Sequence, residues 1–519
     1  MMNDLTRPPV LFTGALIIIW YLKRHFRRSQ DNPHGLPLPP GPQGYPIIGN
    51  LFDLPTWKPW LVYNELFKIY GDMVYMNVLG QGFLVLGSSK RTYDLFEKRS
   101  SNYSDRAQVP MMDLMGYDYN VGLFPYGPWW RYHRRIFHDF LHPNIVGSHE
   151  PTQTAASRTL LRNILRSPED FLDLIRLSFA STIMRIVYGV DVKDIHDPYI
   201  KNVEKAMHGL SDAGTPGNYL VNLLPAMRHI PSWFPGAGWK RMAKSFQAIN
   251  REVAFTPFER VKERMALGEA STSVAATLIE RLSDFEPVKK EEEETVYRNT
   301  CALAYFAGAD TTVSSVQSFF MAMCLYPDIQ KRAQAELDAV LKGRLPEFTD
   351  RPVLPYINAL VKETLRWQPV TPLAVPHMAT NADTYNGFFI PKGTIVFGNT
   401  WSILHNPETY KNPEEYNPER FLKDGKLASG VVEPASAAFG FGRRICVGRF
   451  LSDSSLFSTI AHVLSVYDIK PGLDGDGKEV KFKPDVTPGI VSYPVPFSCR
   501  IIPRSSAAEN LIRDSQAAE

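Results

Sequence analysis

The chain has 519 residues, of which 44% are hydrophobic and 21% are charged, and its formal net charge is +3. This composition is that of a globular protein and excludes a disordered or collagen-like chain, and the small charge gives no reason to expect nucleic-acid binding. Neither a disulfide framework nor a structural zinc site is expected, and a reducing compartment is favoured, because no CxxC pair occurs among the four cysteines, Cys301, Cys324, Cys446 and Cys499.

The first 28 residues are expected to form a membrane anchor with a basic flank. Residues 10–22 read VLFTGALIIIWYL, and four Lys or Arg residues follow between positions 23 and 28. The basic flank should stay on the cytoplasmic side, so the body would face the cytosol. The apolar run is shorter than the ~20 residues that cross a bilayer comfortably. A cleaved signal peptide is the alternative, but no small-residue cleavage site follows the run.

Three further segments are expected after the anchor. Residues 29–50 contain the run LPLPPGP and should form a stiff hinge, because proline fixes the backbone angle φ. Residues 51–504 show no repeat and no flexible linker, so one large catalytic domain is predicted. Residues 505–519 are small and polar, which indicates a flexible tail.

The predicted elements of the body are mostly helices. A hairpin is expected at residues 73–86 with its turn at 80–82, followed by a helix at 90–99. Helical spacing predicts six further helices, at residues 129–141, 173–190, 292–325, 329–341, 354–367 and 447–464. Short strands are expected near residues 384–390, 394–397 and 491–502. The fold class is therefore mainly α with small β-sheets.

The stretch AFGFGRRICVGRF places Cys446 among glycines and arginines. A lone intracellular cysteine is buried filler, a catalytic nucleophile or a ligand of heme iron. Phe439 and Gly442 leave the backbone free to approach a flat ligand and to point N–H groups at the sulfur. Arg444 offers a planar fork to a carboxylate, and Gly448 lets a helix begin near the thiolate. A zinc site would lack further ligands, and a nucleophile would lack a nearby base.

The pattern Phe439-x-x-Gly442-x-Arg444-x-Cys446-x-Gly448 resembles the heme-binding signature of the cytochrome P450 superfamily, and further matches cover almost the whole chain. The resemblance implies the P450 fold and heme b with Cys446 as the iron ligand. It also implies a heme-thiolate monooxygenase, which inserts one atom of O2 into a substrate while the other leaves as water. A thiolate ligand suits this reaction because it favours O–O cleavage.

The stretch 307–312, AGADTT, resembles the oxygen-activating stretch of the family and lies within the predicted helix 292–325. Ala307, Gly308 and Thr311 fall at i, i+1 and i+4, so we expect two small residues and a hydroxyl on one face. Thr311 can donate back to the carbonyl of Ala307, which would loosen the helix. By resemblance, Thr311 and Asp310 are the catalytic residues that supply protons. An exposed Asp-Thr pair is the alternative interpretation.

A charged pair stands at Glu363 and Arg366. Such i,i+3 pairs usually lie in solvent and contribute only ~0.2–0.5 kcal/mol. The resemblance instead implies that both side chains join Arg420, from the stretch NPERF, and fix the core beside the heme. By resemblance, Glu363, Arg366 and Arg420 are therefore expected to stabilise the fold and not to take part in the reaction.

Trp130 and Arg134 resemble the Trp-x-x-x-Arg helix of the family, whose indole and guanidinium face a heme propionate. Trp129 is a competing candidate for the aromatic position, and an amphipathic surface helix is the alternative for the whole segment. His377 stands where family members often carry an Arg or His to the other propionate, although a lone histidine is commonly a loop residue with ordinary partners.

The source of electrons is expected to be a separate protein, because no G-x-G-x-x-G fingerprint follows a predicted strand. The resemblance implies an NADPH-cytochrome P450 reductase of the endoplasmic reticulum as donor, with cytochrome b5 as a possible second donor. An acidic flavoprotein would suit the basic residues Arg131, Arg135, Arg443 and Arg449. Some of these residues would alternatively meet only the propionates or solvent.

The expected substrate is a hydrophobic small molecule, terpenoid, steroid-like or polycyclic aromatic, because the segments that line the pocket by family analogy are apolar or small. Parts of the chain look like microsomal members of filamentous fungi that serve secondary metabolism or xenobiotic oxidation. Two alternatives stay open: a heme-thiolate isomerase or dehydratase without an electron donor, and a non-catalytic heme-binding membrane protein.

Overall fold

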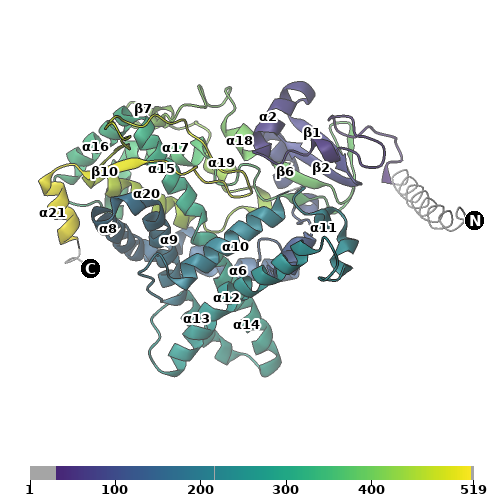
Figure 1. Cartoon of the computed structure of the whole chain (residues 1–519), viewed down its shortest axis with the longest axis horizontal. Helices are drawn as coiled ribbons and strands as arrows, with labels where there is room; N and C mark the ends of the chain where they lie inside the picture. The colour runs from purple at the N-terminus through teal and green to yellow at the C-terminus, as the bar shows by residue number, and fades with distance from the viewer. Residues whose placement is uncertain (1–30, 216, 516–519) are drawn as a thin grey trace, which may run out of the picture.

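The computed structural model describes residues 31–215 and 217–515 (Figure 1). The expected membrane anchor, residues 1–28, lies outside them. Among the described residues, no helix combines the length and apolar character that crossing a membrane requires.

Helices make up most of the first half of the body. They are α2 (Pro59–Tyr70), α3 (Ser89–Thr92), α4 (Ser100–Tyr103), α5 (Pro110–Leu114), α6 (Pro128–Leu141), α7 (Pro143–Val146), α8 (Glu150–Arg166), α9 (Phe171–Tyr188), α10 (Pro198–Gly214), α11 (Leu220–Leu223), α12 (Gly238–Ala266) and α13 (Val274–Glu280). Proline stands in the first turn of several of them, where its missing N–H costs no hydrogen bond.

The second half is again mostly helical. Its helices are α14 (Pro287–Gly308), α15 (Thr311–Leu325), α16 (Pro327–Leu341), α17 (Pro355–Trp367), α18 (Thr400–Leu404), α19 (Ala435–Ala438), α20 (Arg449–Val466) and α21 (Ser506–Asp514). Helices α6, α9, α16, α17 and α20 lie where the sequence predicted them. Helices α8, α10 and α12 were missed, and α12 carries Pro257 in its interior, which masks a helical pattern.

The helix predicted over residues 292–325 is broken. Helix α14 ends at Gly308 and α15 begins at Thr311, and the backbone of Asp310 between them has φ −131°. The hydroxyl of Thr311 donates to the carbonyl of Ala307 at 2.8 Å, as the sequence predicted. The break separates two nearly continuous helices at the stretch singled out for oxygen chemistry.

The ten strands within residues 31–215 and 217–515 form small sheets. The largest has the order β1-β2-β6-β3. The strands are β1 (Met73–Val78), β2 (Gln81–Leu86), β3 (His377–Met378), β4 (Asp383–Tyr385), β5 (Phe388–Ile390), β6 (Ile395–Gly398), β7 (Leu422–Lys423), β8 (Lys426–Leu427), β9 (Tyr467–Pro471) and β10 (Cys499–Pro503).

Distant parts of the chain meet in the largest sheet. Strands β2 and β6 pair in parallel, with Phe83 opposite Ile395, so purple and green segments lie side by side in Figure 1. The hairpin turns at Leu79 and Gly80 rather than at 80–82, and both residues have positive φ, which is the backbone of a tight two-residue turn. The sheet thereby fixes His377 at the start of β3.

The carboxyl-terminal segment differs from the predicted flexible tail. Helix α21 covers Ser506–Asp514, and the hydroxyl of Ser505 accepts a hydrogen bond from the N–H of Ala508 as its amino-terminal cap. Ala508 and Ile512 are buried in the main core. The helix forms because one apolar face packs against α8 and α20, which local composition did not reveal.

Helix α20 runs through the core and positions the cysteine loop at its amino end. Its residues are buried on nearly all sides from Ser454 onward. A polar seam joins it to α8, where the amide of Gln153 donates to the hydroxyls of Ser454 and Ser455 at 2.9 and 2.7 Å. Buried polar groups of this kind fix the relative position of two helices because they need each other as partners.

Candidate active site

The loop before α20 carries Cys446. The Cys446 N–H donates to the carbonyl of Phe439 at 2.8 Å, which closes the loop into a tight turn. Gly442 has φ +57°, and a Cβ there would lie 2.2 Å from the carbonyl oxygen of Phe96. Its N–H donates to Glu97 at 2.9 Å. Gly442 is therefore required by a close backbone approach, whereas the sequence had suggested approach to a ligand.

The Cys446 side chain is exposed to solvent in the structure. Desolvation by the surrounding protein raises the pKa of its thiol. The N–H groups of Gly448 and Arg449 and the guanidinium groups of Arg134 and Arg449 act in the opposite direction. The N–H and guanidinium groups stabilise the negative charge of the thiolate. The thiolate is the form of cysteine that binds a metal ion.

Trp130 and Arg134 lie on the inner side of α6. The indole of Trp130 is 6% exposed, and the Arg444 guanidinium lies 4.3 Å from its centre. Arg134 donates to the carbonyl of Ile445 in the cysteine loop. Trp129 is 39% exposed. The structure thus brings Trp130, and not Trp129, together with the cysteine loop.

His377 is buried behind the same loop. Its Nδ1 atom lies 2.6 Å from the carbonyl oxygen of Tyr103, and its ring stacks on Phe96 with centroids 4.1 Å apart. Burial, followed by the charge of Arg106, lowers the pKa of His377, which favours the neutral imidazole. Because a carbonyl only accepts, Nδ1 must be the protonated nitrogen.

Arg106 is a buried residue of the site that the sequence analysis missed. Its guanidinium donates to the carbonyls of Gly122, Val375 and Pro376 at 3.1, 2.7 and 2.7 Å. Burial, followed by the charge of Arg444, lowers its pKa. No spacing in the sequence distinguishes this arginine. Its neighbours Ser104, Asp105 and Gln108 are polar as well, so composition did not single it out either.

The guanidinium groups of Arg106, Arg134 and Arg444 concentrate positive charge inside the protein. Burial lowers the pKa values of Arg134 and Arg444 to about 10 each, and Asp105 is the carboxylate that acts on both Arg106 and Arg444. Among the described residues, the buried Nη1 atom of Arg444 has no hydrogen-bond partner. Buried cations require anionic partners, so the site suits a ligand with carboxylates beside a soft metal. Heme, with two propionates and an iron, fits these residues.

The end of α14 and the start of α15 carry a row of partly accessible residues. Leu303, Ala307 and Thr311 stand at i, i+4 and i+8 and are partly accessible, whereas most of their neighbours on α14 and α15 are buried. Gly308, predicted to share a face with Ala307 and Thr311, is partly accessible as well. A Cβ there would lie 2.9 Å from Ile183 of α9, so Gly308 allows the two helices to approach.

Asp310 is buried beside the helix break. The Nε of Arg176 on α9 lies 3.3 Å from one carboxyl oxygen, and the phenol of Tyr493 donates to the other. Burial raises the pKa of Asp310, and the charge of Arg176 and the Tyr493 hydrogen bond oppose this effect. Neither Arg176 nor Tyr493 was predicted from the sequence. The raised pKa of Asp310 and its place next to Thr311 make this carboxyl a candidate for proton exchange.

A family model described as "Cytochrome P450" matches residues 39–499. The chain belongs to the cytochrome P450 family. This P450 is 46% identical to "Cytochrome P450 monooxygenase COX2" of Coprinopsis cinerea, over 93% of this chain and 92% of that protein. It is 42% identical to "Cytochrome P450 monooxygenase COX1" of the same fungus, over 96% of this chain and 98% of that one.

A further relative has a more specific name. "Tryptamine 4-monooxygenase" of Psilocybe cyanescens is 38% identical over 93% of this chain and 94% of its own length. Relatives that match over nearly their full length make this chain a cytochrome P450 monooxygenase, and membership of the family implies a heme-thiolate centre. Their fungal origin agrees with the resemblance that the sequence suggested.

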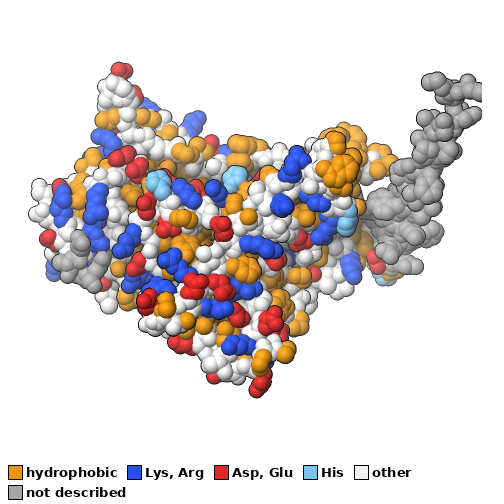
Figure 2. All heavy atoms as spheres, turned by 60° about the horizontal axis from the view of Figure 1, so that its bottom comes forward, with side chains coloured by type: hydrophobic (Ala, Val, Ile, Leu, Met, Phe, Trp, Pro, Cys, Tyr) orange, Lys and Arg blue, Asp and Glu red, His pale blue; other side chains and the backbone are white. Residues whose placement is uncertain are grey.

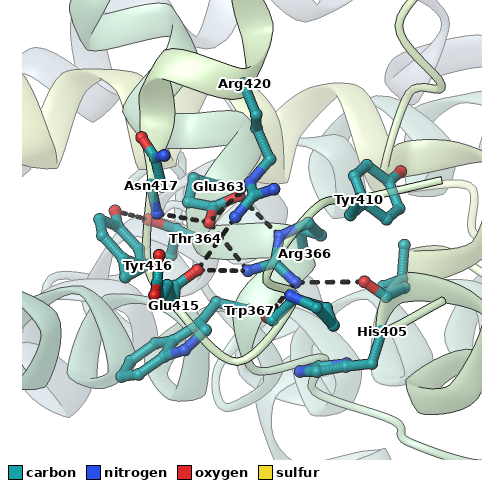
Figure 3. A network of polar contacts seen from close by, with 12 residues as sticks. Glu363, Thr364, Arg366, Trp367, His405, Tyr410, Glu415, Tyr416, Asn417 and Arg420 are labelled. Atoms are coloured by element: carbon teal, nitrogen blue, oxygen red, sulfur yellow. Dashed lines mark hydrogen bonds and ion pairs between the residues drawn. The ribbon is translucent and has the colours of Figure 1, made fainter. Parts of the chain in front are cut away.

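Glu363, Arg366 and Arg420 form one buried network in this P450 (Figure 3). Arg366 donates to both carboxyl oxygens of Glu363, at 2.7 and 2.8 Å, and both side chains are fully buried. The Nε of Arg420 lies 3.2 Å from Glu363, and the Asn417 N–H donates to the same carboxylate at 2.7 Å. Arg366 also holds the carbonyl of Pro413 at 2.7 Å.

The consequence is that one carboxylate joins α17 to the loop of residues 411–420. That loop has little regular structure of its own, so its shape depends on donors from Arg366 and Arg420. The Glu363–Arg366 pair is bidentate, and two parallel hydrogen bonds both strengthen the interaction and fix the orientation of the side chains.

Glu363→Gln tests this network. We expect it to lower the free energy of unfolding by about 3–5 kcal/mol, because two buried guanidinium groups lose their counter-charge. The measurement is thermal denaturation of the purified protein, together with the amount of heme bound per chain.

Glu509→Gln is the matched control, because Glu509 pairs with Arg513 at the surface. Such a pair contributes about 0–1 kcal/mol. If Glu363→Gln destabilised the protein no more than Glu509→Gln does, the network would not hold the loop.

Proposed function

We propose that this P450 inserts one oxygen atom into a hydrophobic small molecule of terpenoid, steroid-like or polycyclic aromatic type, in secondary metabolism or xenobiotic oxidation. Electrons come from NADPH through a separate reductase. The observation that carries the proposal is the exposed Cys446 thiol, which lies beside the guanidinium groups of Arg134 and Arg449 and next to the buried Arg444. When bound there, heme supplies the redox chemistry that activates O2.

The residues of the cysteine loop hold the cofactor. Cys446 ligates the iron, and the N–H groups of Gly448 and Arg449 stabilise its negative charge. Arg444 brings an unpaired buried N–H to a propionate, and Trp130 and Arg134 border the same position. His377 is proposed to meet the other propionate. Its bond to Tyr103 leaves Nε2 for that contact, and a nearby carboxylate would raise the pKa of the ring.

Asp310 and Thr311 move protons. Thr311 lies in the row of partly accessible residues of α14 and α15, and its hydroxyl is held by the Ala307 carbonyl at the helix break. Asp310, the next residue along the chain, connects through Arg176 to the partly exposed carboxylate of Glu204, 3.3 Å from the guanidinium. Arg176 stays protonated and links the two carboxylates by charge, and the Asp310 carboxyl itself is the group proposed to pass protons to Thr311.

The substrate is proposed to be hydrophobic because the loop after α4 carries apolar side chains toward the interior. A cavity of about 170 Å³ is lined by Val109, Met112, Leu123 and Phe124, with Asp113 and Asp118 also on its border. Gln108 and Tyr117 line it as well, and a mainly apolar wall with a small number of polar groups is typical of ligand sites.

The proposed reductase surface is basic. Arg131, Arg135 and Arg443 are exposed, and Arg131 and Arg443 both lie against the ring of Tyr126, at 5.7 and 5.4 Å from its centre. The arginines therefore converge beside the cysteine loop instead of scattering over the surface. A positive patch at that place attracts an acidic flavoprotein and orients it toward the cofactor. Arg449 turns back to the Cys446 carbonyl at 2.9 Å.

The proposed location is the endoplasmic reticulum membrane, with the body facing the cytosol. Large apolar side chains are exposed at one end of the body, namely Tyr45, Ile47, Phe52 and Trp57 from one segment and Leu220, Leu224, Trp233 and Phe234 from another. The two segments adjoin, because a Cβ at Gly217 would lie 3.7 Å from the methyl group of Thr56. Figure 2 shows hydrophobic side chains gathered at the end where the described chain begins.

Charge in the second segment suits anionic lipid. Residues 213–251 include no Asp or Glu and carry five basic residues, Arg228, Lys240, Arg241, Lys244 and Arg251. Aromatic side chains at a membrane interface combined with nearby Lys and Arg are typical of interfacial membrane binding.

Cys446→Ser and Thr311→Ala test the chemistry. With a P450 reductase and NADPH, we expect Cys446→Ser to lose the thiolate signature in the reduced carbon monoxide spectrum. Thr311→Ala should keep that spectrum but lower product per NADPH by about tenfold, because a positioned proton donor is lost. Products are sought by mass as hydrophobic compounds with one added oxygen.

Thr312→Ala is the matched control, because that hydroxyl lies 3.2 Å from the Ser452 hydroxyl. It should couple NADPH use to product as the wild type does. A Thr311→Ala enzyme with wild-type coupling would contradict the role of Thr311, and product formation without NADPH would indicate an isomerase or dehydratase.

The double charge reversal Arg131→Glu and Arg135→Glu tests the reductase surface. We expect electron transfer from the reductase to slow by about tenfold at low ionic strength, with a smaller difference at high salt, since screening weakens such steering. Stopped-flow reduction under carbon monoxide measures the rate. Lys205→Glu on α10, also exposed, is the control. Equal rates for the two proteins would place the docking surface elsewhere.

Deletion of residues 1–30 tests the membrane surface. We expect the shortened protein to sediment with vesicles that contain anionic lipid, and the double change Trp57→Ser and Trp233→Ser to weaken that binding by about tenfold. Tyr93→Ser, at a residue that is 56% exposed elsewhere, should bind as the parent does. A shortened protein that stays entirely in the supernatant would show that the body makes no membrane contact of its own.

A further inference from the structure

Tyr493 is a candidate for a role that nothing in the sequence indicated. Its phenol donates to Oδ2 of Asp310, while Arg176 lies 3.3 Å from Oδ1. The Thr311 hydroxyl donates to Ala307. Both oxygens of the buried carboxyl are thus engaged by partners from outside α14 and α15. One partner lies on α9 and the other on the segment before β10.

The loop that carries Tyr493, residues 486–494, is closed on itself. The Tyr493 N–H donates to the hydroxyl of Thr487 at 3.0 Å, and the Thr487 N–H donates to the Tyr493 carbonyl at 2.7 Å. The hydroxyl of Ser492 donates to the Thr487 carbonyl at 2.8 Å. These bonds hold the tyrosine in a defined place within an otherwise irregular segment.

The same loop is tied to three other parts of the fold. Ser314 of α15 donates to the Ser492 carbonyl at 2.5 Å, and the Ser492 N–H donates to Val370, after α17, at 2.8 Å. The Ile490 N–H donates to the hydroxyl of Ser211 on α10 at 3.1 Å. A displacement of α10, of the segment after α17, or of the loop itself therefore moves the phenol against Asp310.

The charged groups that face Asp310 are few. Arg176 also lies 3.3 Å from Glu204 on α10 and 3.4 Å from Asp173 on α9. Burial raises the pKa of Asp310, the Arg176 charge and the Tyr493 and Arg176 hydrogen bonds lower it, and the charge of Glu204 raises it. The phenol is the neutral member of this set, so it sets the orientation of the carboxyl without adding charge.

We propose that Tyr493 is a positioning residue for Asp310, and that the phenol holds the carboxyl toward Arg176, so that the 486–494 loop sets how readily protons reach Thr311. This inference rests on the proposed role of Asp310 in proton supply. It assigns the control of that supply to a segment more than 170 residues farther along the chain than Asp310.

Tyr493→Phe in the heme-loaded protein is the test. Infrared difference spectra at a series of pH values follow the carboxyl band of Asp310, which is identified as the band that Asp310→Asn removes. A hydrogen bond to the ionised form favours that form, so its loss should move the protonation midpoint upward by about one pH unit. The solvent deuterium isotope effect on NADPH oxidation with reductase should change in the same variant.

Two further variants make the result decisive. Thr487→Val loosens the hold on Tyr493 and should shift the midpoint in the same direction, by a smaller amount, which keeps the test valid if Tyr493→Phe does not fold. Tyr219→Phe removes a phenol from another carboxylate, that of Asp212, and should leave both readouts at wild-type values.

The outcomes separate the two levels of the argument. An unchanged Asp310 midpoint in both Tyr493→Phe and Thr487→Val would overturn the positioning role, even if both variants melted at a lower temperature. If the midpoint shifted but Asp310→Asn coupled NADPH to product normally, Asp310 would not supply protons, and the role of Tyr493 in catalysis would fall with it.

Discussion

The excess of buried positive charge beside Cys446 is the constraint on which this P450 depends. Arg106, Arg134 and Arg444 are brought together from three separate segments, and the carboxylate of Asp105 acts on Arg106 and Arg444. Burying a cation without an anionic partner raises the free energy of the folded state, so the protein without its ligand is less stable than it would be with the charges paired. An anionic, metal-centred ligand supplies that pairing. Binding of heme and stability of the fold are therefore coupled through the same guanidinium groups.

The two buried networks solve different problems. Around Glu363 the charges are complete, since one carboxylate meets two guanidinium groups and a backbone N–H, and the result is a rigid support. Around Asp310 the carboxyl is shared between one guanidinium, that of Arg176, and the neutral phenol of Tyr493, and burial raises its pKa. The first arrangement suits structure, whereas the second suits proton transfer.

The helix break connects these parts. In a continuous helix over residues 292–325, the backbones of Asp310 and Thr311 would both have regular helical geometry. The break instead frees the Asp310 backbone from helical geometry, and the Thr311 hydroxyl replaces a lost contact at Ala307. Asp310 thereby reaches partners on α9 and on the 486–494 loop, while Thr311 remains in the row of partly accessible residues. The two residues proposed to supply protons therefore stand at this irregularity of the helix.

The sequence by itself determined the mainly helical class, the cysteine loop and the Thr311 bond to Ala307, because periodicity, glycine placement and i,i+4 spacing act over a few residues. Only the tertiary structure decided that Trp130 rather than Trp129 faces the loop, that Arg106 joins the site, and that Tyr493 holds Asp310. It also closed the sheet by the parallel pairing of β2 with β6. Such contacts join residues tens to hundreds of positions apart, and packing selects them among many partners that local pattern leaves equally available.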